Sequence, residues 1–67
     1  MEEGVARHQA INLTESELTN LSIEQLNDRF NHAYYQGYNS NNNKITKEIW
    51  VDILNETQKE ISKRKLN

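Results

Sequence analysis

Asp28 and His32 are the pair of side chains whose types and spacing could support acid–base chemistry or begin a metal site. They are four positions apart, so a helix would place them one turn apart on the same face. A catalytic site would also need a nucleophile and an enclosing pocket, but the chain has no cysteine and Ser22 is placed to cap a helix. The two histidines, His8 and His32, are too few for a zinc site unless carboxylates complete it. We therefore interpret the pair as an exposed charge pair and expect no enzyme activity, metal or cofactor.

The asparagine-rich segment over residues 37–45 stands where the calcium loop of an EF-hand would stand. A calcium loop needs several carboxylates, a central glycine and a closing glutamate at fixed spacing. Residues 38–45 contain no Asp or Glu, and Ile49 falls where the closing glutamate belongs. We expect no calcium binding and interpret the segment as a loop, because Asn and Ser side chains compete with the helix for backbone hydrogen bonds.

Lys63, Arg64 and Lys65 are the residues best suited to contact phosphate. At the end of a helix, however, three cations complement the helix dipole. Four acidic residues precede them between positions 48 and 60, and a helix-turn-helix reader would normally use a third helix and a tighter turn. DNA binding is therefore the weakest of three functional hypotheses.

Four aromatic residues, Tyr34, Tyr35, Tyr38 and Trp50, form the most informative group. Tyr34 and Trp50 fit the core, whereas Tyr35 lies off the apolar stripe of its helix and Tyr38 follows the expected helix end. Tyrosine and tryptophan are favoured at binding hot spots, since they bury a large area with few rotatable bonds. These residues either cap a thin core or form a protein-binding surface.

The first helix that must position these residues is predicted over about residues 22–36. Ser22 and Gln25 form a capping box, and Gly37 can end the helix in the left-handed conformation. Its apolar positions follow a helical stripe and are Ile23, Leu26, Phe30, Ala33 and Tyr34.

The second helix is predicted over about residues 46–65. Thr46 is the expected N-cap, with Ile45 and Trp50 in the positions of a hydrophobic staple. Its apolar stripe is Ile49, Trp50, Ile53, Leu54, Thr57 and Ile61.

Two such helices joined by a loop over residues 37–45 predict an all-α fold, an antiparallel two-helix hairpin within residues 14–67. In this arrangement Tyr34 would lie near Trp50. Residues 1–13 are polar without a sustained period, so we expect a flexible N-terminal arm. The capping box in Thr14-Glu15-Ser16-Glu17 predicts one short helical turn near residues 15–20.

The composition indicates that extra buried surface must come from oligomerisation or from a partner. A single domain of 67 residues buries only roughly 60% of its unfolded surface, and without cysteine it has no disulfide to compensate. Residues 1–31 carry six acidic and two basic residues, whereas residues 32–67 carry four acidic and six basic ones. This separation favours electrostatic steering of another protein over a broad nucleic-acid footprint.

The sequence gives no sign of a membrane or a secretory route. No apolar run approaches the roughly 20 residues that span a bilayer, and the N-terminus lacks the basic start and apolar core of a signal peptide. We therefore expect a cytoplasmic protein.

The segment Leu21-Ser22-Ile23-Glu24-Gln25-Leu26, with Phe30 and Ala33, and the ending Glu60-Ile61-Ser62-Lys63-Arg64-Lys65-Leu66 resemble the two helices of the Sda family. This family consists of small helical-hairpin checkpoint proteins that inhibit a sporulation histidine kinase in Gram-positive bacteria. The resemblance implies an inhibitor that docks on a kinase dimerisation domain. The chain differs from the family in its N-terminal arm of about twenty residues and its longer inter-helix loop, so no functional residue is carried over.

Three hypotheses follow. The first is a non-enzymatic regulatory protein, an inhibitor or adaptor, that binds another protein through Tyr34, Tyr35, Tyr38 and Trp50. The second is a structural homo-oligomer in which hairpins pair into a four-helix bundle to bury Ile49, Ile53 and Ile61. The third is a small DNA-binding regulator.

Overall fold

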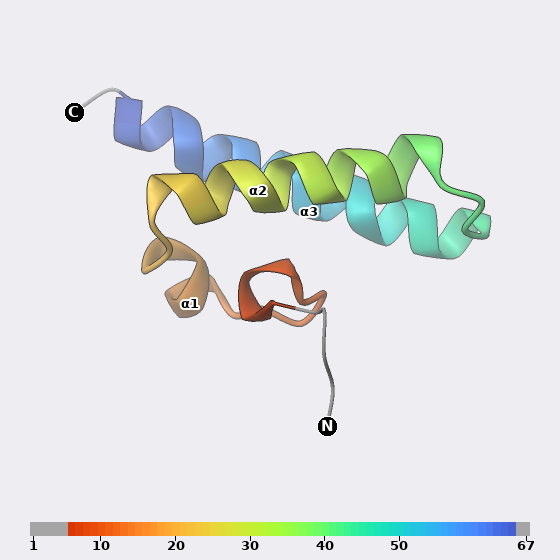
Figure 1. The fold of residues 1–67 in the computed structure, drawn as a ribbon, viewed down its shortest axis with the longest axis horizontal. Helices are drawn as coiled ribbons and strands as arrows, with labels where there is room; N and C mark the ends of the chain where they lie inside the picture. The colour runs from red at the N-terminus through yellow and green to blue at the C-terminus, as the bar shows by residue number, and fades with distance from the viewer. Residues whose placement is uncertain (1–5, 66–67) are drawn as a thin grey trace.

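The computed structural model describes residues 6–65, and helices account for all regular structure in that range (Figure 1). The predicted all-helical class is confirmed. None of the helices within the described range is both long and apolar enough to cross a membrane. The elements in chain order are η1 (Arg7–Gln9), α1 (Glu15–Thr19), α2 (Ile23–Tyr34), η2 (Tyr35–Asn39) and α3 (Lys44–Lys65).

Helices α1 and α2 both begin at the capping boxes that the sequence predicts. The Ser22 hydroxyl accepts from the backbone N–H of Gln25 at 3.1 Å, while the Gln25 side chain accepts from the Ser22 N–H at 3.0 Å. Thr14 and Glu17 make the equivalent pair at α1. Each box satisfies backbone donors that a helix start leaves without partners, and this fixes where the helix begins.

The end of α2 corrects the prediction made for Gly37. Instead of ending there in a left-handed conformation, the chain continues as a π-helical turn, η2, which closes with the Ser40 N–H donating to the Tyr35 carbonyl at 2.9 Å. Gly37 is buried and its backbone is not left-handed. A Cβ at this position would lie 3.1 Å from Val51 Cγ2, so glycine permits a close approach between η2 and α3.

Helix α3 begins two residues before the predicted start at 46. The Asn43 side-chain oxygen accepts from the Thr46 N–H at 2.9 Å, so Asn43 performs the capping role assigned to Thr46. The connection after η2 is therefore only residues 40–43. Ile45 lies in the first turn and is 71% exposed, so it is not buried as a staple beside Trp50.

Helices α2 and α3 lie side by side and form the core between them (Figure 1). The Arg64 Nη1 atom at the end of α3 donates to the Leu21 carbonyl just before α2, at 2.6 Å. The buried apolar residues come from the predicted stripes, and each fully buried large side chain contributes about 1.5–3 kcal/mol. They are Leu26, Ala33, Trp50, Ile53 and Leu54, with Phe30 packed against them.

Three predicted core positions are instead half-exposed: Tyr34, which is described below, and two isoleucines. Ile23 is 44% exposed and Ile49 is 39% exposed. Both lie at the edge of their stripes, and a pair of helices buries only the narrow seam where they meet.

The N-terminal segment does not extend away from the helices over residues 6–13, where a flexible arm was expected. Its 3₁₀ turn η1 lies against α2, and α1 follows beside the start of α2 (Figure 1). Residues 1–5 of the expected arm lie outside the described residues.

Candidate protein-binding surface

Three of the four predicted aromatic residues lie together at the end of the molecule where η2 connects α2 to α3. Tyr34, Tyr35 and Tyr38 are 49%, 54% and 55% exposed. The rings of Tyr34 and Tyr38 are 5.2 Å apart and tilted by 45°, because one turn of η2 separates the two residues. Each of the three residues thus keeps about half of its surface accessible to solvent.

Trp50, the fourth, is a core residue that is only 5% exposed, so little of its surface is accessible for contact with a partner. Its ring meets His32 edge-on, with centroids 5.0 Å apart and planes at 82°. Tyr34 was predicted to fit the core near Trp50, but it is 49% exposed, and the ring that meets Trp50 is that of His32. His32 and Tyr34 are two residues apart and therefore point about 200° apart around α2. His32 faces Trp50, and Tyr34 is left at the surface.

Side-chain hydrogen bonds hold the backbone under these tyrosines. The Asn42 amide donates to the Gln36 side-chain oxygen at 2.6 Å, and the Ser40 hydroxyl donates to the Gln36 carbonyl at 2.9 Å. With Gly37 packed on Val51, these bonds fix η2 against α3. The tyrosines therefore stand on an ordered support.

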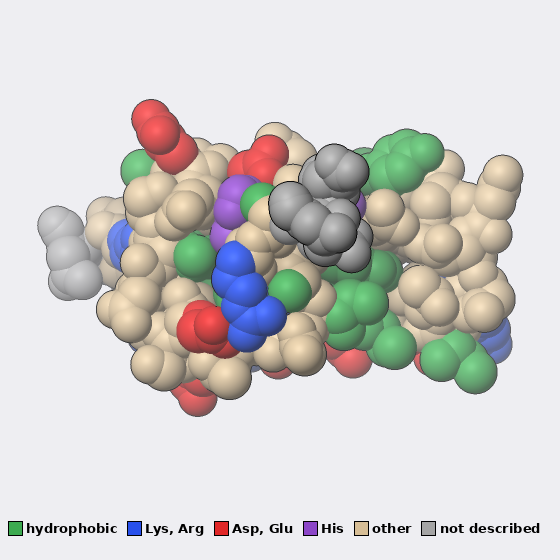
Figure 2. Space-filling model, turned by 60° about the horizontal axis from the view of Figure 1, so that its bottom comes forward, with side chains coloured by type: hydrophobic (Ala, Val, Ile, Leu, Met, Phe, Trp, Pro, Cys, Tyr) green, Lys and Arg blue, Asp and Glu red, His purple; other side chains and the backbone are tan. Residues whose placement is uncertain are grey.

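Ile45, predicted as half of a hydrophobic staple, and Ile49, predicted in the core, add further exposed apolar surface. They are four residues apart on α3, so they lie on one side of that helix. Five of the seven exposed large hydrophobic residues in the described range come from positions 34–49. Figure 2 shows hydrophobic side chains gathered over the half of the molecule that holds this connection. We call Tyr34, Tyr35, Tyr38, Ile45 and Ile49 the loop-end surface.

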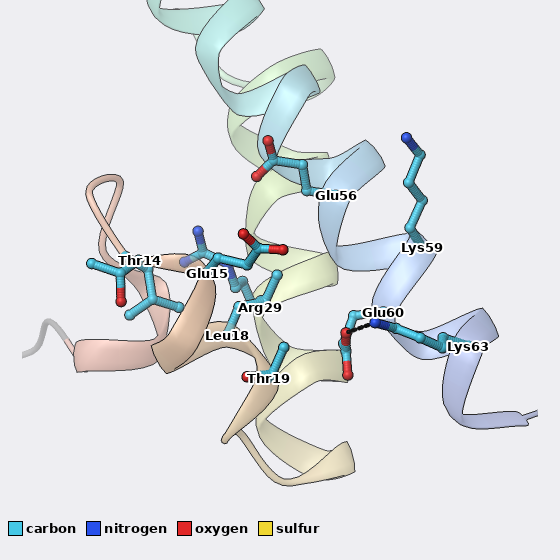
Figure 3. Close-up of a pocket in the computed structure, with 10 residues that line it drawn as sticks. Thr14, Glu15, Leu18, Thr19, Arg29, Glu56, Lys59, Glu60 and Lys63 are labelled. Carbon is cyan, nitrogen blue, oxygen red and sulfur yellow. Dashed lines mark ion pairs between the residues drawn. The ribbon is translucent and has the colours of Figure 1, made fainter. Parts of the chain in front are cut away.

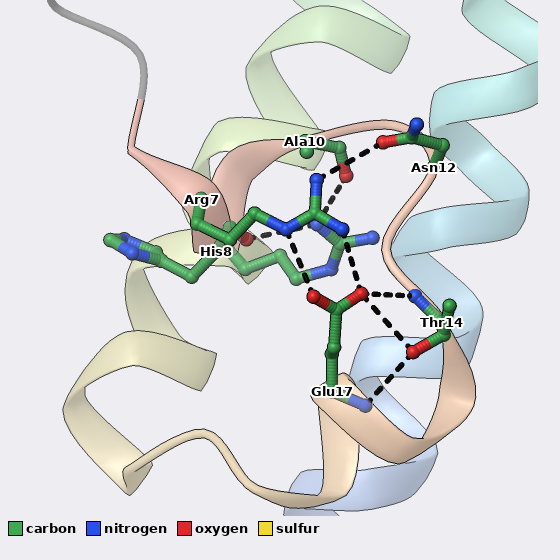
Figure 4. A network of polar contacts seen from close by, with 7 residues as sticks. Arg7, His8, Ala10, Asn12, Thr14 and Glu17 are labelled. Atoms are coloured by element: carbon green, nitrogen blue, oxygen red, sulfur yellow. Dashed lines mark hydrogen bonds and ion pairs between the residues drawn. The ribbon is translucent and has the colours of Figure 1, made fainter.

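A second group of side chains, which the sequence analysis missed, ties the N-terminal segment together (Figure 4). The Arg7 guanidinium donates from Nη2 and Nε to the two carboxylate oxygens of Glu17, at 2.8 and 3.0 Å. The hydrogen bond from Arg7, followed by one from the Thr14 backbone, lowers the pKa of Glu17 to about 2. Glu17 therefore closes the capping box of α1 and joins α1 to η1 at the same time.

Asp28 binds the N-terminal segment directly, and the His32 predicted as its pair is the smallest of the electrostatic influences on it. His8 Nε2 and Gln9 Nε2 both lie 2.7 Å from Asp28 Oδ2. The hydrogen bond from His8, then the one from Gln9, lowers the pKa of this carboxyl. Within the described residues, no three His, Cys, Asp or Glu side chains are grouped so that they could hold a metal ion.

Arg29, the next residue, is 3% exposed beneath the same segment. Its Nη1 atom donates to the carbonyls of His8 and Ala10, at 2.9 and 2.7 Å. Burial lowers the pKa of this guanidinium, with Glu56 acting in the opposite direction. We call Asp28 and Arg29 the clamp. Asp28 binds the side chains of the η1 turn, and Arg29 binds its backbone.

A hollow of about 700 Å³ is lined by residues of α1 and α3 (Figure 3). Leu13 and Leu18 are the apolar side chains of its lining. The charged groups around it, drawn in Figure 3, balance in sign, so the hollow does not select an anion or a cation. They are Glu15, Glu56 and Glu60 against Arg29, Lys59 and Lys63.

Two of the basic residues near the C-terminus are used within the fold. Arg64 pairs with Glu60 at 2.9 Å and donates to the carbonyls of Thr19 and Leu21. Lys63 Nζ lies 3.6 Å from the other oxygen of Glu60. The hydrogen bond from Arg64 lowers the pKa of Glu60. These contacts leave less positive charge for phosphate than the sequence alone indicates.

Comparison with protein families, with curated proteins and with solved structures finds no match for this chain.

Proposed function

We propose that this chain is a small, non-enzymatic regulatory protein of the cytoplasm that binds another protein, as an inhibitor or adaptor. It would use the loop-end surface of an antiparallel hairpin formed by α2 and α3. The observation that carries this proposal is the exposure of Tyr34, Tyr35 and Tyr38, each about half, on adjoining turns. Exposed apolar residues gathered in one place mark interaction sites more often than scattered ones do.

The support beneath these tyrosines strengthens the proposal. A tyrosine loses little rotamer entropy on binding, and it can pack its ring while its hydroxyl stays hydrogen-bonded. Because the Gln36–Asn42 bond and the Gly37 contact already fix η2, a partner would not have to order this backbone. A signalling kinase is the target class that the resemblance to Sda suggests.

The two other hypotheses have less support. A four-helix bundle was expected to bury Ile49, Ile53 and Ile61 between copies, but Ile53 is already only 7% exposed within one chain. A DNA-binding role would rely on the C-terminal cations, and Arg64 is engaged by Glu60 and two carbonyls.

The test starts from a partner captured from the native host and measures its affinity for purified variants. We expect Tyr35→Ala and Tyr38→Ala each to weaken binding by roughly 30-fold or more, which corresponds to a hot-spot loss of about 2 kcal/mol. Helicity should not change, since both side chains are half-exposed. The matched control is Ile11→Ala, because Ile11 is 51% exposed but lies in the N-terminal segment.

Unchanged affinity in both tyrosine variants would show that the loop-end surface is not the contact. A mass in solution that rises with concentration, and that Ile49→Ala returns to the monomer value, would support the homo-oligomer instead.

A further inference from the structure

The N-terminal segment, residues 6–19, is held together by its own side chains. The Arg7–Glu17 ion pair joins η1 to α1, and the capping box of Thr14 and Glu17 fixes the start of α1. None of the residues in η1 or α1 is buried. The segment is therefore held together by its own polar contacts and lies on the surface of α2 and α3, and no apolar side chain of η1 or α1 is buried there.

The clamp is the main polar attachment of η1 to α2. Arg29 Nη1 binds two backbone carbonyls that are two residues apart, those of His8 and Ala10. Asp28 Oδ2 accepts from two successive side chains, His8 and Gln9. The clamp thus recognises one turn of peptide with a particular chemistry, namely two carbonyls on one side and two neighbouring donors on the other.

A clamp of charged residues is suited to release its occupant. A permanent contact would gain more from apolar packing, because burying Arg29 costs solvation that its two hydrogen bonds must recover. Asp28 is already half-exposed, so the group that regains water when the turn leaves is chiefly the buried Arg29, which is polar. At the other end Arg64 donates to the carbonyls of Thr19 and Leu21, so the segment has a second attachment, to α3, that does not involve the clamp.

We propose that the clamp is a binding site for a peptide turn of a partner protein, and that the chain's own Arg7–Ala10 turn is its built-in competitor. The occupant has the chemistry of the bound segment: a tight turn with two successive hydrogen-bond donors such as His or Gln, and no acidic side chain facing Asp28. The site lies on another part of α2 than the loop-end surface and does not depend on the function proposed there. Because the competing turn is tethered to the clamp, its effective concentration there is on the order of millimolar or higher. To displace it, a partner's turn must bind the clamp more tightly than the chain's own turn does.

The experiment weakens the competitor in the full chain and adds a synthetic peptide of residues 6–19. The double variant His8→Ala/Gln9→Ala removes both donors to Asp28 and leaves the clamp intact. We expect the peptide to bind this variant at least roughly tenfold more tightly than it binds the unmodified chain, since two hydrogen bonds to a carboxylate no longer oppose it. The amide signals of Asp28 and Arg29 should shift as the peptide is added.

Adding Asp28→Ala to the double variant should weaken this binding by roughly tenfold or more, because the His8 and Gln9 donors of the peptide lose their acceptor while Arg29 keeps its two carbonyls, whereas adding Asn31→Ala should not change it. Asn31 is the matched control, because it is exposed on the same helix. The proposal is overturned if millimolar peptide leaves the Asp28 and Arg29 amides unshifted in the double variant. It is equally overturned if the peptide binds the Asp28→Ala variant as tightly as its parent.

Discussion

Replacing Gly37 by alanine tests how η2 packs on α3. In a helical turn this change normally stabilises a protein by about 0.5–1 kcal/mol, because alanine has less backbone freedom to lose. Here the new Cβ would lie 3.1 Å from Val51 Cγ2, closer than ordinary contact. The next neighbours, the Val51 nitrogen and the Lys47 carbonyl oxygen, would be at ordinary distances of 3.5 and 3.6 Å. The Val51 methyl group is thus the main obstacle.

The size of the effect follows from these two opposing terms. Overpacking costs about 1–3 kcal/mol, and valine cannot rotate away freely because its branched Cβ restricts χ1. When the gain in backbone entropy is subtracted from this cost, Gly37→Ala should lower the free energy of unfolding by about 1 kcal/mol. In a Val51→Ala background the obstructing methyl group is absent. The same change should then raise the free energy of unfolding by about 0.5–1 kcal/mol.

The assay is a double-mutant cycle of urea unfolding, followed by far-ultraviolet circular dichroism, on four chains. These are the unmodified chain, Gly37→Ala, Val51→Ala and the double variant. The structure requires the sign of the Gly37→Ala effect to reverse between the two backgrounds. If Gly37 were instead a left-handed helix stop, alanine would cost about 1–2 kcal/mol whatever occupies position 51. An equal loss in both backgrounds would therefore refute the close approach of η2 to α3.

Two further predictions concern the capping residues. Ser22→Ala should lower the free energy of unfolding by about 1 kcal/mol, because the Gln25 N–H loses its acceptor, and an unchanged urea midpoint would contradict the capping box. Glu17 has a pKa of about 2 in the folded chain against an ordinary 4.5, so its contribution to stability is complete above about pH 4.5 and is lost as the pH falls towards 2. Urea unfolding of Glu17→Gln at a series of pH values should therefore show a free energy of unfolding that changes less with pH in this window. If it falls as steeply as in the unmodified chain, the Arg7–Glu17 bond is not the source of the pH dependence.

Features that depend on neighbours in the chain could be predicted from the sequence. The capping boxes at Thr14 and Ser22 involve residues three positions apart, so the residue types alone identify them. The apolar stripes of α2 and α3 are similarly local in origin. They predicted the buried Leu26, Trp50 and Leu54, because helical spacing places these on one face.

The errors arose where two local signals competed or where tertiary packing decided. Asn43 and Thr46 can both cap a helix, and only the folded backbone shows which side chain reaches a free N–H. Gly37 suits both a left-handed stop and a close contact, and Val51, fourteen positions away, selects the second. For the same reason, the helical spacing of apolar residues in α2 did not predict that His32, and not Tyr34, would face Trp50.

One signal of the N-terminal segment was present in the sequence of α2. Arg29 lies three residues after Leu26 and four before Ala33, so it falls on the buried stripe and not on the solvent face. A charged group there needs hydrogen-bond partners that two apolar helix faces do not supply. A third layer of peptide supplies them in the carbonyls of His8 and Ala10. The same requirement applies to any competitor for the clamp. A ligand that offered Arg29 a carboxylate would bring a second negative charge next to Asp28, so backbone carbonyls are the acceptors that fit both residues at once.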